Sequence, residues 1–474
     1  MLKTSAPRLQ ACLWLMVCAA AGLALLFLFD DSCQQDAPLH FLYARWAWEH
    51  PVLFVDVWCR PLFTLLYAFP ALIGYRAARL LTLLISLATA WQTYRLAGDL
   101  RLPRSPLAVA LVWMQPSFFL FATENMTELL FALIYIIALR LHHRGWVKMG
   151  MLVASLTILA RPEGFFLCIL WALWASGVRS PAFRLNARIP LLATGALLWW
   201  IAAWVITSDP LFIKHNWPAI WPLTGTVYGA AGLLAYPARL PEVVGVFLLP
   251  PFFYGLVHLL RRRELGTLTS SFLLLFILHT IFRAFGLLGS AGYPRYLVTV
   301  SPAIALITLV GWNRMANLFS HAARLTQTVS AALIVAMSFF VNFAYADGAE
   351  MSRDARAIDQ IHAWFEANPR PVAKFIWGQP YACVVFDRDP WEQPVFTRNR
   401  ERDLALLGEQ PAGTLVCWDA KIGPAWHGLK AEDFEEAGFV RLHSQSFTLQ
   451  GYILDRPWFG FGGPRHQTMH LFYK

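Results

Sequence analysis

Long apolar runs separated by short polar or basic stretches make up most of the first 345 residues. The first run, residues 11 to 29, has no charged side chain, and it exceeds the roughly 7 to 15 apolar residues of a signal peptide. We therefore expect it to be retained as a helix. Further runs of spanning length are 77–97, 106–122, 126–141, 147–160, 163–178, 189–206, 242–260, 267–287, 296–312 and 326–345. The pattern predicts an α-helical polytopic membrane protein with about eleven transmembrane helices.

After residue 345 the apolar runs become short and the charge density rises. The pattern predicts an amphipathic helix from about residue 353 to 367, and a second helix in DFEEAG (433–438). Four β-like runs complete this region: KFIW (374–377), ACVVF (382–386), TLVCW (414–418) and QGYIL (450–454). We therefore expect two domains, a transmembrane domain over residues 1–345 and a small α/β domain over residues 346–474.

Composition supports the membrane class. Hydrophobic residues make up 57% of the 474 residues and charged residues 14%, against roughly 25% charged residues in soluble domains. The net charge of +10 does not indicate a nucleic-acid partner, because the basic residues form short dispersed clusters. Seven cysteines include no CxxC pair, so neither a zinc site nor a thioredoxin-like motif is supported. Two pairs, Cys33 with Cys59 and Cys383 with Cys417, share a region, and the sequence leaves a disulfide in either pair open.

The charged residues of the expected transmembrane domain sort by side. With a cytoplasmic N-terminus, every inner connection carries arginine or lysine, as the positive-inside rule requires. An odd number of helices then places the C-terminal domain on the periplasmic or extracellular side, and the compact loops favour a bacterial inner membrane. Only the acidic residues Asp99 and Glu264 lie inside. The others lie at the outer face: Asp30, Asp31, Asp36, Glu49, Asp56, Glu124, Glu128, Glu163, Asp209 and Glu242. This asymmetry indicates a function on the outer side.

The first outer loop combines acids with apolar segments. FDDSCQQDAPLHFLY places three aspartates beside the end of the first helix, although a carboxylate costs about 2.5 to 3.5 kcal/mol at a helix centre. HFLYARWAWEH (40–50) and RPLFTLLYAFPALIG (60–74) are too short to span and are typical of helices lying at the membrane surface. We expect these two helices to wall a cavity that opens outward. The alternative is that the acids only solvate a helix end.

Several segments match a known family in order and spacing. They are the acids after the first helix, then RPLFTLLYAFPALIGYRAARLLTLLISLATAWQTYRLA, TENMTELLFAL, ARPEGFF and YPRYLVTVSPAIAL. Together they resemble the GT-C superfamily of polytopic glycosyltransferases, which includes protein O-mannosyltransferases and the aminoarabinose transferase of lipid A. The resemblance implies transfer of a sugar, with inversion, from a polyprenyl-phosphate carrier to a glycan, lipid or protein acceptor. Some members use a divalent cation such as Mg²⁺ or Mn²⁺ and others do not, so both alternatives stay open.

The reaction needs a base and cations, and the outer face offers both. Asp36 is our first candidate for the base that takes the acceptor's proton, one turn from His40; Asp30 and Asp31 compete with it. A departing lipid phosphate is suited to arginine, whose planar fork forms paired bonds. The expected phosphate and substrate contacts are Arg60, Arg161, Glu163, Tyr293 and Arg295, with Glu124, Glu128, Lys214 and His215 as further candidates.

Structural roles for these residues are the alternative. Glu124 and Glu128 are four residues apart, so we expect them on one helical face, orienting an acceptor, a metal or Arg161, unless they cap a helix with Thr123 or Thr127. Arg161 is also able to form a purely structural ion pair with Glu163 or Glu124, and Arg295 to extend toward the membrane surface.

A lipid or solute transporter is the rival function, and a structural subunit is a third. Transporters tend to have internal repeats and charge near the middle of the bilayer. This sequence has no convincing repeat, and its acids gather at one rim. The pattern therefore favours an enzyme.

Overall fold

The computed structural model describes residues 5–28, 36–176, 187–219, 221, 223–225, 228–318, 324–347, 350–397, 399–420, 422–449 and 465–474. Contacts divide the chain into two units. The helical unit comprises Met1–Leu28 and Ala47–Ala344, and the sheet unit comprises Phe29–Trp46 and Tyr345–Lys474. The sheet unit thus takes in part of the first loop, which the expected division at residue 345 assigns to the transmembrane domain.

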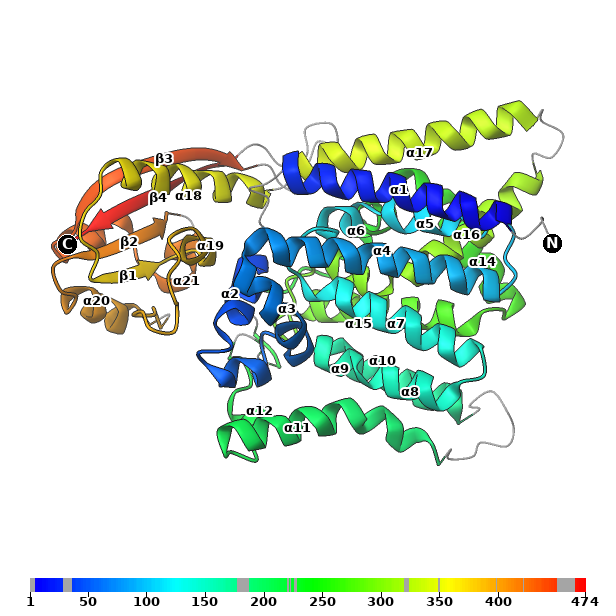
Figure 1. Cartoon of the computed structure of the whole chain (residues 1–474), viewed down its shortest axis with the longest axis horizontal. Coiled ribbons are helices and arrows are strands. Elements are labelled where there is room, and N and C mark those ends of the chain that lie inside the picture. Colours follow the sequence, from blue (N-terminus) through cyan, green and yellow to red (C-terminus); the bar gives the residue numbers. More distant parts are fainter. Residues whose placement is uncertain are drawn as a thin grey trace. The chain divides into compact units, whose positions relative to one another are not determined.

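The helical unit consists of helices that run roughly parallel to one another (Figure 1). Its elements are α1 Ser5–Leu28, η2 Pro51–Val55, α3 Pro61–Ile73, α4 Tyr75–Asp99, α5 Leu107–Trp113, α6 Pro116–Phe121, α7 Thr127–His143, α8 Val147–Ser155, α9 Thr157–Ala160, α10 Glu163–Ala175, η3 Ile189–Ala193, α11 Thr194–Thr207, α12 Phe212–His215, η4 Pro237–Arg239, α13 Leu240–Val244, η5 Val246–Leu248, α14 Leu249–Arg262, α15 Gly266–Phe285, η6 Pro294–Val300, α16 Ser301–Leu318 and α17 Arg324–Asp347.

Within the described ranges, 4 helical segments are long and apolar enough to cross a membrane: Ala6–Phe27, Ile189–Thr207, Gly266–Phe285 and Pro294–Ala316. A fifth is added if Pro237–Val244 and Val246–Arg262, which meet at 98°, form one bent span. The chain is therefore mostly helical with membrane-like helices, but the expected count of about eleven is not confirmed.

A break inside one apolar run accounts for part of the lower count. Pro116 begins α6 only three residues after α5 ends, which divides the expected run 106–122. Pro162 in turn separates α9 from α10, between the expected runs 147–160 and 163–178. Proline has no backbone N–H and disfavours helical geometry in the residue before it. Arg161, which precedes Pro162, is accordingly extended, with φ −161° and ψ 150°. Hydropathy alone does not register such breaks, so a continuous apolar run becomes two short helices.

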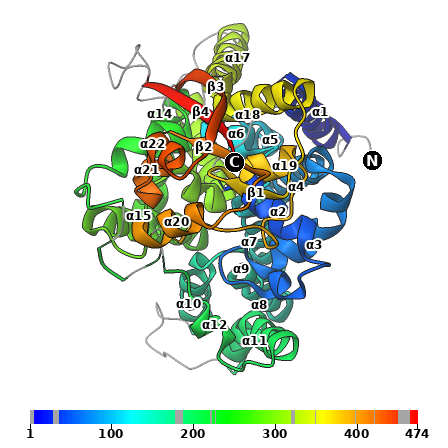
Figure 2. The same cartoon turned by 90° about the vertical axis from the view of Figure 1, so that its left-hand side faces the viewer.

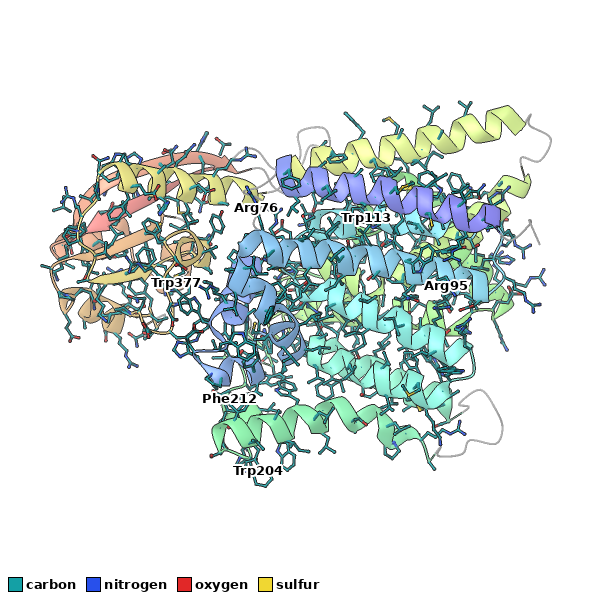
Figure 3. All side chains as sticks on the ribbon, viewed as in Figure 1. Arg76, Arg95, Trp113, Trp204, Phe212 and Trp377 are labelled. Carbon is teal, nitrogen blue, oxygen red and sulfur yellow. The ribbon has the colours of Figure 1, made fainter. Side chains whose placement is uncertain are left out.

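Apolar faces on the outside of the unit agree with a lipid environment. Leu65, Phe69 and Ile73 of α3 are exposed and recur every four residues, so they share one face of the helix. Trp204 likewise lies on the outer side of α11 (Figure 3). Soluble proteins rarely expose apolar faces of this extent.

Small residues let the inner helices approach closely. Gly255 of α14 faces Gly311 of α16, and a methyl group at either position would overlap the facing backbone. Trp113 at the end of α5 is fully buried and meets Phe118 and Phe119 edge to face. These contacts form a closely packed interior, which fixes the helix ends that carry the charged residues.

The sheet unit is a four-stranded sheet in the order β1-β2-β4-β3. β1 and β2 are parallel, and the other pairs are antiparallel, with Leu415 opposite Tyr473 and Val440 opposite the same residue. Its elements are α2 Ala37–Trp46, α18 Glu350–Ala367, β1 Lys374–Trp377, α19 Pro380–Val385, α20 Arg400–Gly408, β2 Thr414–Asp419, α21 Ile422–His427, α22 Ala431–Glu436, β3 Val440–Leu449 and β4 Arg465–Tyr473. Helix α18 packs along β3 (Figure 2). Trp364 of this helix stacks on His443 of the strand.

Most of the elements expected after residue 345 are confirmed. The amphipathic helix is α18, DFEEAG overlaps α22, and KFIW and TLVCW are β1 and β2. The strand expected at ACVVF is wrong, because Pro380 begins a short helix there. QGYIL lies outside the described residues.

The cysteine pairs have different outcomes. Cys383 and Cys417 are free and buried thiols, so the disulfide between them is not formed. Burial raises the pKa of Cys417 to about 12, which keeps this thiol protonated and unreactive. The pair of Cys33 and Cys59 is not tested, because Cys33 lies outside the described residues.

Candidate functional site

Four charged residues from distant segments meet at one end of the helical unit. Glu128 lies in the first turn of α7, Arg161 follows α9, Glu163 begins α10, and Arg295 lies in η6. All four stand at helix ends because a glutamate or arginine there is spared the centre of an apolar helix. We call this set the arginine network.

The distances show a continuous arrangement. Arg161 Nη1 lies 2.6 Å from Glu128 Oε1, and its Nη2 and Nε bind the two oxygens of Glu163 at 2.9 and 3.2 Å. Arg295 Nε lies 3.4 Å from the same oxygen of Glu128. The expected ion pair between Arg161 and Glu163 is therefore present, and Glu128 joins both arginines.

The arginine network is almost closed to solvent. Exposed side-chain fractions are 0% for Glu128, 9% for Arg161, 11% for Glu163 and 10% for Arg295. Taking an ion out of water costs several kcal/mol even after relaxation. The two positive and two negative charges offset one another, so the arrangement persists only as a whole.

Arg60 is a third arginine within electrostatic reach. It precedes α3 with φ 76°, a left-handed conformation that strains a residue with a side chain and is common at functional sites. Its guanidinium donates to the carbonyl of Val57 and lies 4.5 Å from the ring centre of Trp221. Burial and, to a smaller extent, the charge of Arg161 lower the pKa of Arg60 to about 10. A positive charge thus stands beside the arginine network without adding a carboxylate partner to it.

Asp56 lies in the same loop. The sequence places it at the outer face but does not mark it as a site candidate. Its Oδ1 accepts hydrogen bonds from the backbone N–H groups of Trp58 and Cys59 at 2.8 and 2.9 Å. Burial raises the pKa of Asp56, although these hydrogen bonds and the charge of Arg60 lower it in part. Raised basicity is the property that a carboxylate base needs.

Aromatic rings line the arginines. The guanidinium of Arg295 lies 4.8 Å from the ring centre of Tyr293 and 5.9 Å from that of Tyr296, and Arg161 lies 5.5 Å from Tyr296. Such cation–π contacts hold a guanidinium by its face and leave its edge to form hydrogen bonds. Tyr293 was a candidate, but Tyr296, its neighbour in the same motif, was missed.

His279 of α15 is the second residue that the sequence did not indicate. Its Nε2 lies 3.7 Å from Glu163 Oε1, and its ring lies between those of Tyr236 and Tyr296, at 5.8 and 4.9 Å. A single histidine inside an apolar run gives no signal, because its neighbours come from other helices.

Glu124 differs from Glu128. Helix α7 begins at Thr127 and Met126 is extended, so the expected shared helical face of the two glutamates is wrong. Glu124 instead lies 3.6 Å from Arg79 of α4, and both side chains are fully buried. The expected capping by Thr123 or Thr127 is also wrong, because no side chain caps α7.

A divalent cation does not fit the arginine network. The oxygens of Glu128 and Glu163 already contact guanidinium groups, and a cation would have to displace those. Across the described residues, no group of three His, Cys, Asp or Glu side chains is arranged to hold a metal ion.

The remaining candidates lie elsewhere. Asp36 and His40 belong to the sheet unit, where the backbone N–H of His40 donates to the carbonyl of Asp36 at 2.9 Å. Asp30 and Asp31 lie outside the described residues. His215 pairs with Asp209 at 2.8 Å, and Lys214 beside it is also exposed. The cavity expected between the two loop helices remains an expectation, because α2 and α3 belong to different units.

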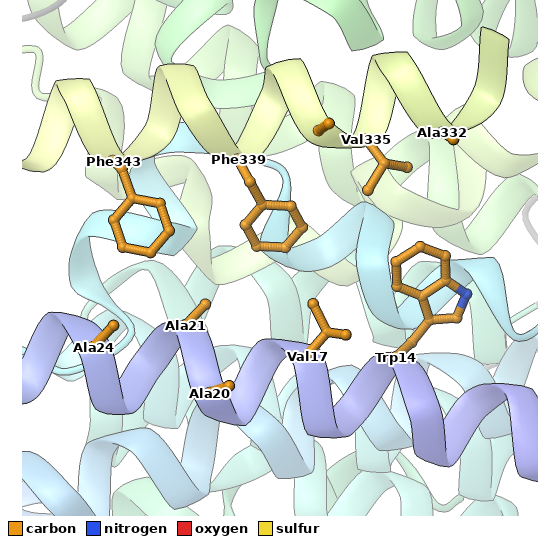
Figure 4. Close-up of a pocket in the computed structure, with 10 residues that line it drawn as sticks. Trp14, Val17, Ala20, Ala21, Ala24, Ala332, Val335, Phe339 and Phe343 are labelled. Atoms are coloured by element: carbon orange, nitrogen blue, oxygen red, sulfur yellow. The ribbon is translucent and has the colours of Figure 1, made fainter. Parts of the chain in front are cut away.

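An apolar hollow of about 560 Å³ lies between α1 and α17 (Figure 4). Trp14, Phe339 and Phe343 border it, and alanines such as Ala20 and Ala24 leave room for it. Its lining offers no group that is able to carry out chemistry, so it suits only hydrocarbon.

No family model matches this chain, and no curated protein matches it either. The arginine network and the sequence motifs that supply it are therefore the basis for assigning a function.

Proposed function

We propose that the protein is a GT-C-type glycosyltransferase that moves a sugar from a polyprenyl-phosphate carrier to an acceptor hydroxyl, with inversion. One observation carries the proposal. Arg161 and Arg295, which are far apart in the sequence, converge on Glu128 in a buried position at the helix ends. A lipid phosphate that enters there meets two guanidinium groups already held in place.

The chemistry of the arginine network supports a phosphate rather than a carboxylate or neutral ligand. Arg161 and Arg295 contact Glu128, and Arg60 adds a third guanidinium group, whose charge is offset by Asp56. A phosphodiester carries one negative charge, which guanidinium groups bind with paired hydrogen bonds. Preorganised cations that need little reorganisation during the reaction are the main source of electrostatic catalysis.

The general base comes from the first outer loop. Asp36 is our first candidate, with Asp30 and Asp31 as competitors from the same stretch. Asp56 joins them, because its pKa is raised by burial and it lies beside Arg60. Asp36→Asn and Asp56→Asn variants separate these choices. Replacing the aspartate that acts as the base should remove most of the transfer activity, and replacing the other aspartate should not.

We further propose a bacterial inner membrane location with the N-terminus cytoplasmic and the sheet unit periplasmic or extracellular. The short apolar helices would then lie in the bilayer together with the longer ones, which raises the number of crossings toward eleven. Exposed apolar residues at four-residue spacing on α10 (Phe165, Ile169 and Leu173) support a lipid-facing helix. Interfacial placement of α3 follows from its exposed apolar face.

A lipid or solute transporter is the second candidate. The bent pair Pro237–Val244 and Val246–Arg262 favours it, because transporters use broken helices at their binding sites. The bend falls at Gly245, which has φ 95°. The arginine network, however, is built from helix ends rather than from the break itself.

Purified protein in detergent micelles separates the two functions, because micelles have no second compartment. Incubated with a bacterial polyprenyl-phosphate-sugar extract and a lipid acceptor extract, the enzyme releases polyprenyl phosphate, which mass spectrometry detects. A transporter leaves the donor intact. The matched control for Arg161→Ala is Arg144→Ala, at the opposite end of the bundle. Release by Arg161→Ala at the wild-type rate, or no release by the wild type, would contradict the proposal.

A further inference from the structure

His279 is a buried polar side chain without a hydrogen bond. Its exposed fraction is 3%, and among the described residues neither ring nitrogen has a hydrogen-bond partner. The contact with Glu163 at 3.7 Å is an ion pair only if the ring is protonated. Leaving a buried donor unsatisfied costs about 1 to 3 kcal/mol, so such a group calls for an explanation.

The groups around His279 leave its ring nitrogens without a hydrogen bond. The charged and titratable groups beside it are Glu163 of α10, Arg161 after α9, Tyr296 of η6 and Tyr236 before η4. Glu163 is the negative neighbour, but both of its oxygens are already bound by Arg161. The ring is therefore beside the arginine network without being hydrogen-bonded to it.

Transfer adds a negative charge that the neighbouring groups do not offset. The four members of the arginine network sum to zero, and the charge of Arg60 is offset by Asp56. A sugar phosphodiester has one negative charge. The phosphate monoester that departs carries up to two, since its second pKa is about 6. The reaction therefore needs a further positive charge beside the phosphate.

We propose that His279 supplies that charge: protonated, it donates a hydrogen bond to the phosphate of the lipid carrier and favours the departing monoester over the bound diester. This inference rests on the proposed function. It makes His279 a catalytic residue of the phosphate side, distinct from the carboxylate on the acceptor side.

The transfer step breaks one bond and forms another. The bond between the sugar's anomeric carbon and the phosphate oxygen breaks, and its electron pair stays on that oxygen. The acceptor oxygen forms the new bond to the anomeric carbon and gives its proton to the carboxylate base. The phosphate gains one negative charge, which the proton held by the His279 imidazolium compensates through a hydrogen bond.

The test is the binding of farnesyl phosphate to the full-length protein in detergent, measured by calorimetry at several pH values between about pH 6 and 8. The readout is the dissociation constant of His279→Gln divided by that of the wild type. The ligand's own titration affects both constants equally, so it cancels in this ratio. We expect a ratio of about ten at the acidic end, the equivalent of about 1.4 kcal/mol. We expect the ratio to fall to about two at the basic end, where neither side chain carries charge.

The control is His258→Gln in α14. His258 also has a ring nitrogen without a hydrogen-bond partner among the described residues, but it does not belong to the arginine network, and its ratio should stay near one. A His279→Gln ratio that does not change with pH would assign His279 a structural role and overturn the inference.

Two further outcomes distinguish a failure of this inference from a failure of the proposed function. If Arg295→Gln weakens binding while the His279→Gln ratio stays flat, only the inference fails. If wild-type protein does not bind farnesyl phosphate, both fail. Should His279→Gln not fold, proton uptake by the wild type on binding at about pH 7.5, where the ligand is already mostly dianionic, replaces the ratio. Uptake supports the inference and its absence overturns it.

Discussion

The two ends of α7 show two ways of placing charge in one helix. At its start, Glu128 is completely buried and contacts Arg161 and Arg295. Near its end, Arg140 binds Asp99 at 2.8 Å, and Arg144, just past the helix, reaches the same carboxylate with 52% of its side chain exposed. The same helix thus lies beside a fully enclosed carboxylate at its start and beside a carboxylate that is 23% exposed at its end.

Comparing the two ends of α7 distinguishes charges that membrane topology explains from charges that stability does not explain. Exposed ion pairs contribute about 0 to 1 kcal/mol, and basic residues at that end are accounted for by membrane topology. A buried cluster has a desolvation cost that well-packed apolar side chains would avoid. Charge retained where apolar residues would serve stability better is therefore the stronger indication of function.

Removing one member of the arginine network should have the largest effect on stability. Arg161→Ala leaves Glu128 and Glu163 buried without their main partner, and we expect it to lower the free energy of unfolding by about 3 to 5 kcal/mol. Arg144→Ala should change that free energy by about 0 to 1 kcal/mol. Reversible unfolding in mixed detergent micelles measures both, and equal losses would erase the distinction between the two ends.

Ligand affinity should separate the ends next. Arg295→Gln removes a charged donor, so the affinity for farnesyl phosphate should fall about 10- to 100-fold, corresponding to about 1.5 to 3 kcal/mol. Arg140→Gln at the opposite end should leave the affinity within about twofold. Titration calorimetry of the two proteins decides, and a similar loss for both would mean that the phosphate site was misplaced.

An ion pair of the sheet unit extends the comparison to intermediate burial. Arg400 binds Asp433 with two hydrogen bonds of 2.7 and 2.9 Å, which lower the pKa of Asp433 below its usual value. Its contribution to stability is complete above the unfolded pKa of about 3.9 and is lost as the pH falls through the lower folded pKa. Asp433→Asn should therefore flatten the acid-induced loss of stability, with a smaller effect than Arg161→Ala. Acid titration followed by tryptophan fluorescence is the measurement, and an unchanged acid transition would argue against the pair.

The smallest effect is expected at Asp99. Asp99→Asn removes the partner of Arg140 and Arg144, yet Arg140 keeps its hydrogen bond to Gln92 and Arg144 is 52% exposed. The free energy of unfolding should change by about 0 to 1 kcal/mol, and high salt should reduce even this difference. A loss comparable to that of Arg161→Ala would show that the exposed end also depends on its charges.

The sequence predicted which residues form the arginine network better than it predicted how they are arranged. Arg161, Glu163 and Arg295 stand out because each interrupts or borders an apolar run, and the side assignment places them together. The role of Glu128 differs from that of Glu124 only because Met126 is extended, which no periodicity shows. His279 was missed because its partners come from three other segments.

The fold shows the same limit. Strands β1 and β2 were found because KFIW and TLVCW are short continuous apolar runs next to glycine and proline residues. The short helix at 380–385 was read as a strand because Pro380 was not weighed as a helix start. The number of membrane crossings is not confirmed, in part because Pro116 divides a run that hydropathy treats as continuous.

The position of a bound lipid phosphate tests the central claim most directly. A structure determined with undecaprenyl phosphate should place its phosphorus within hydrogen-bonding reach of Arg161 and Arg295, with His279 facing the same phosphate. A phosphate held instead by the exposed cations at the other end of the bundle, Arg261, Arg262 and Arg263, would contradict the account.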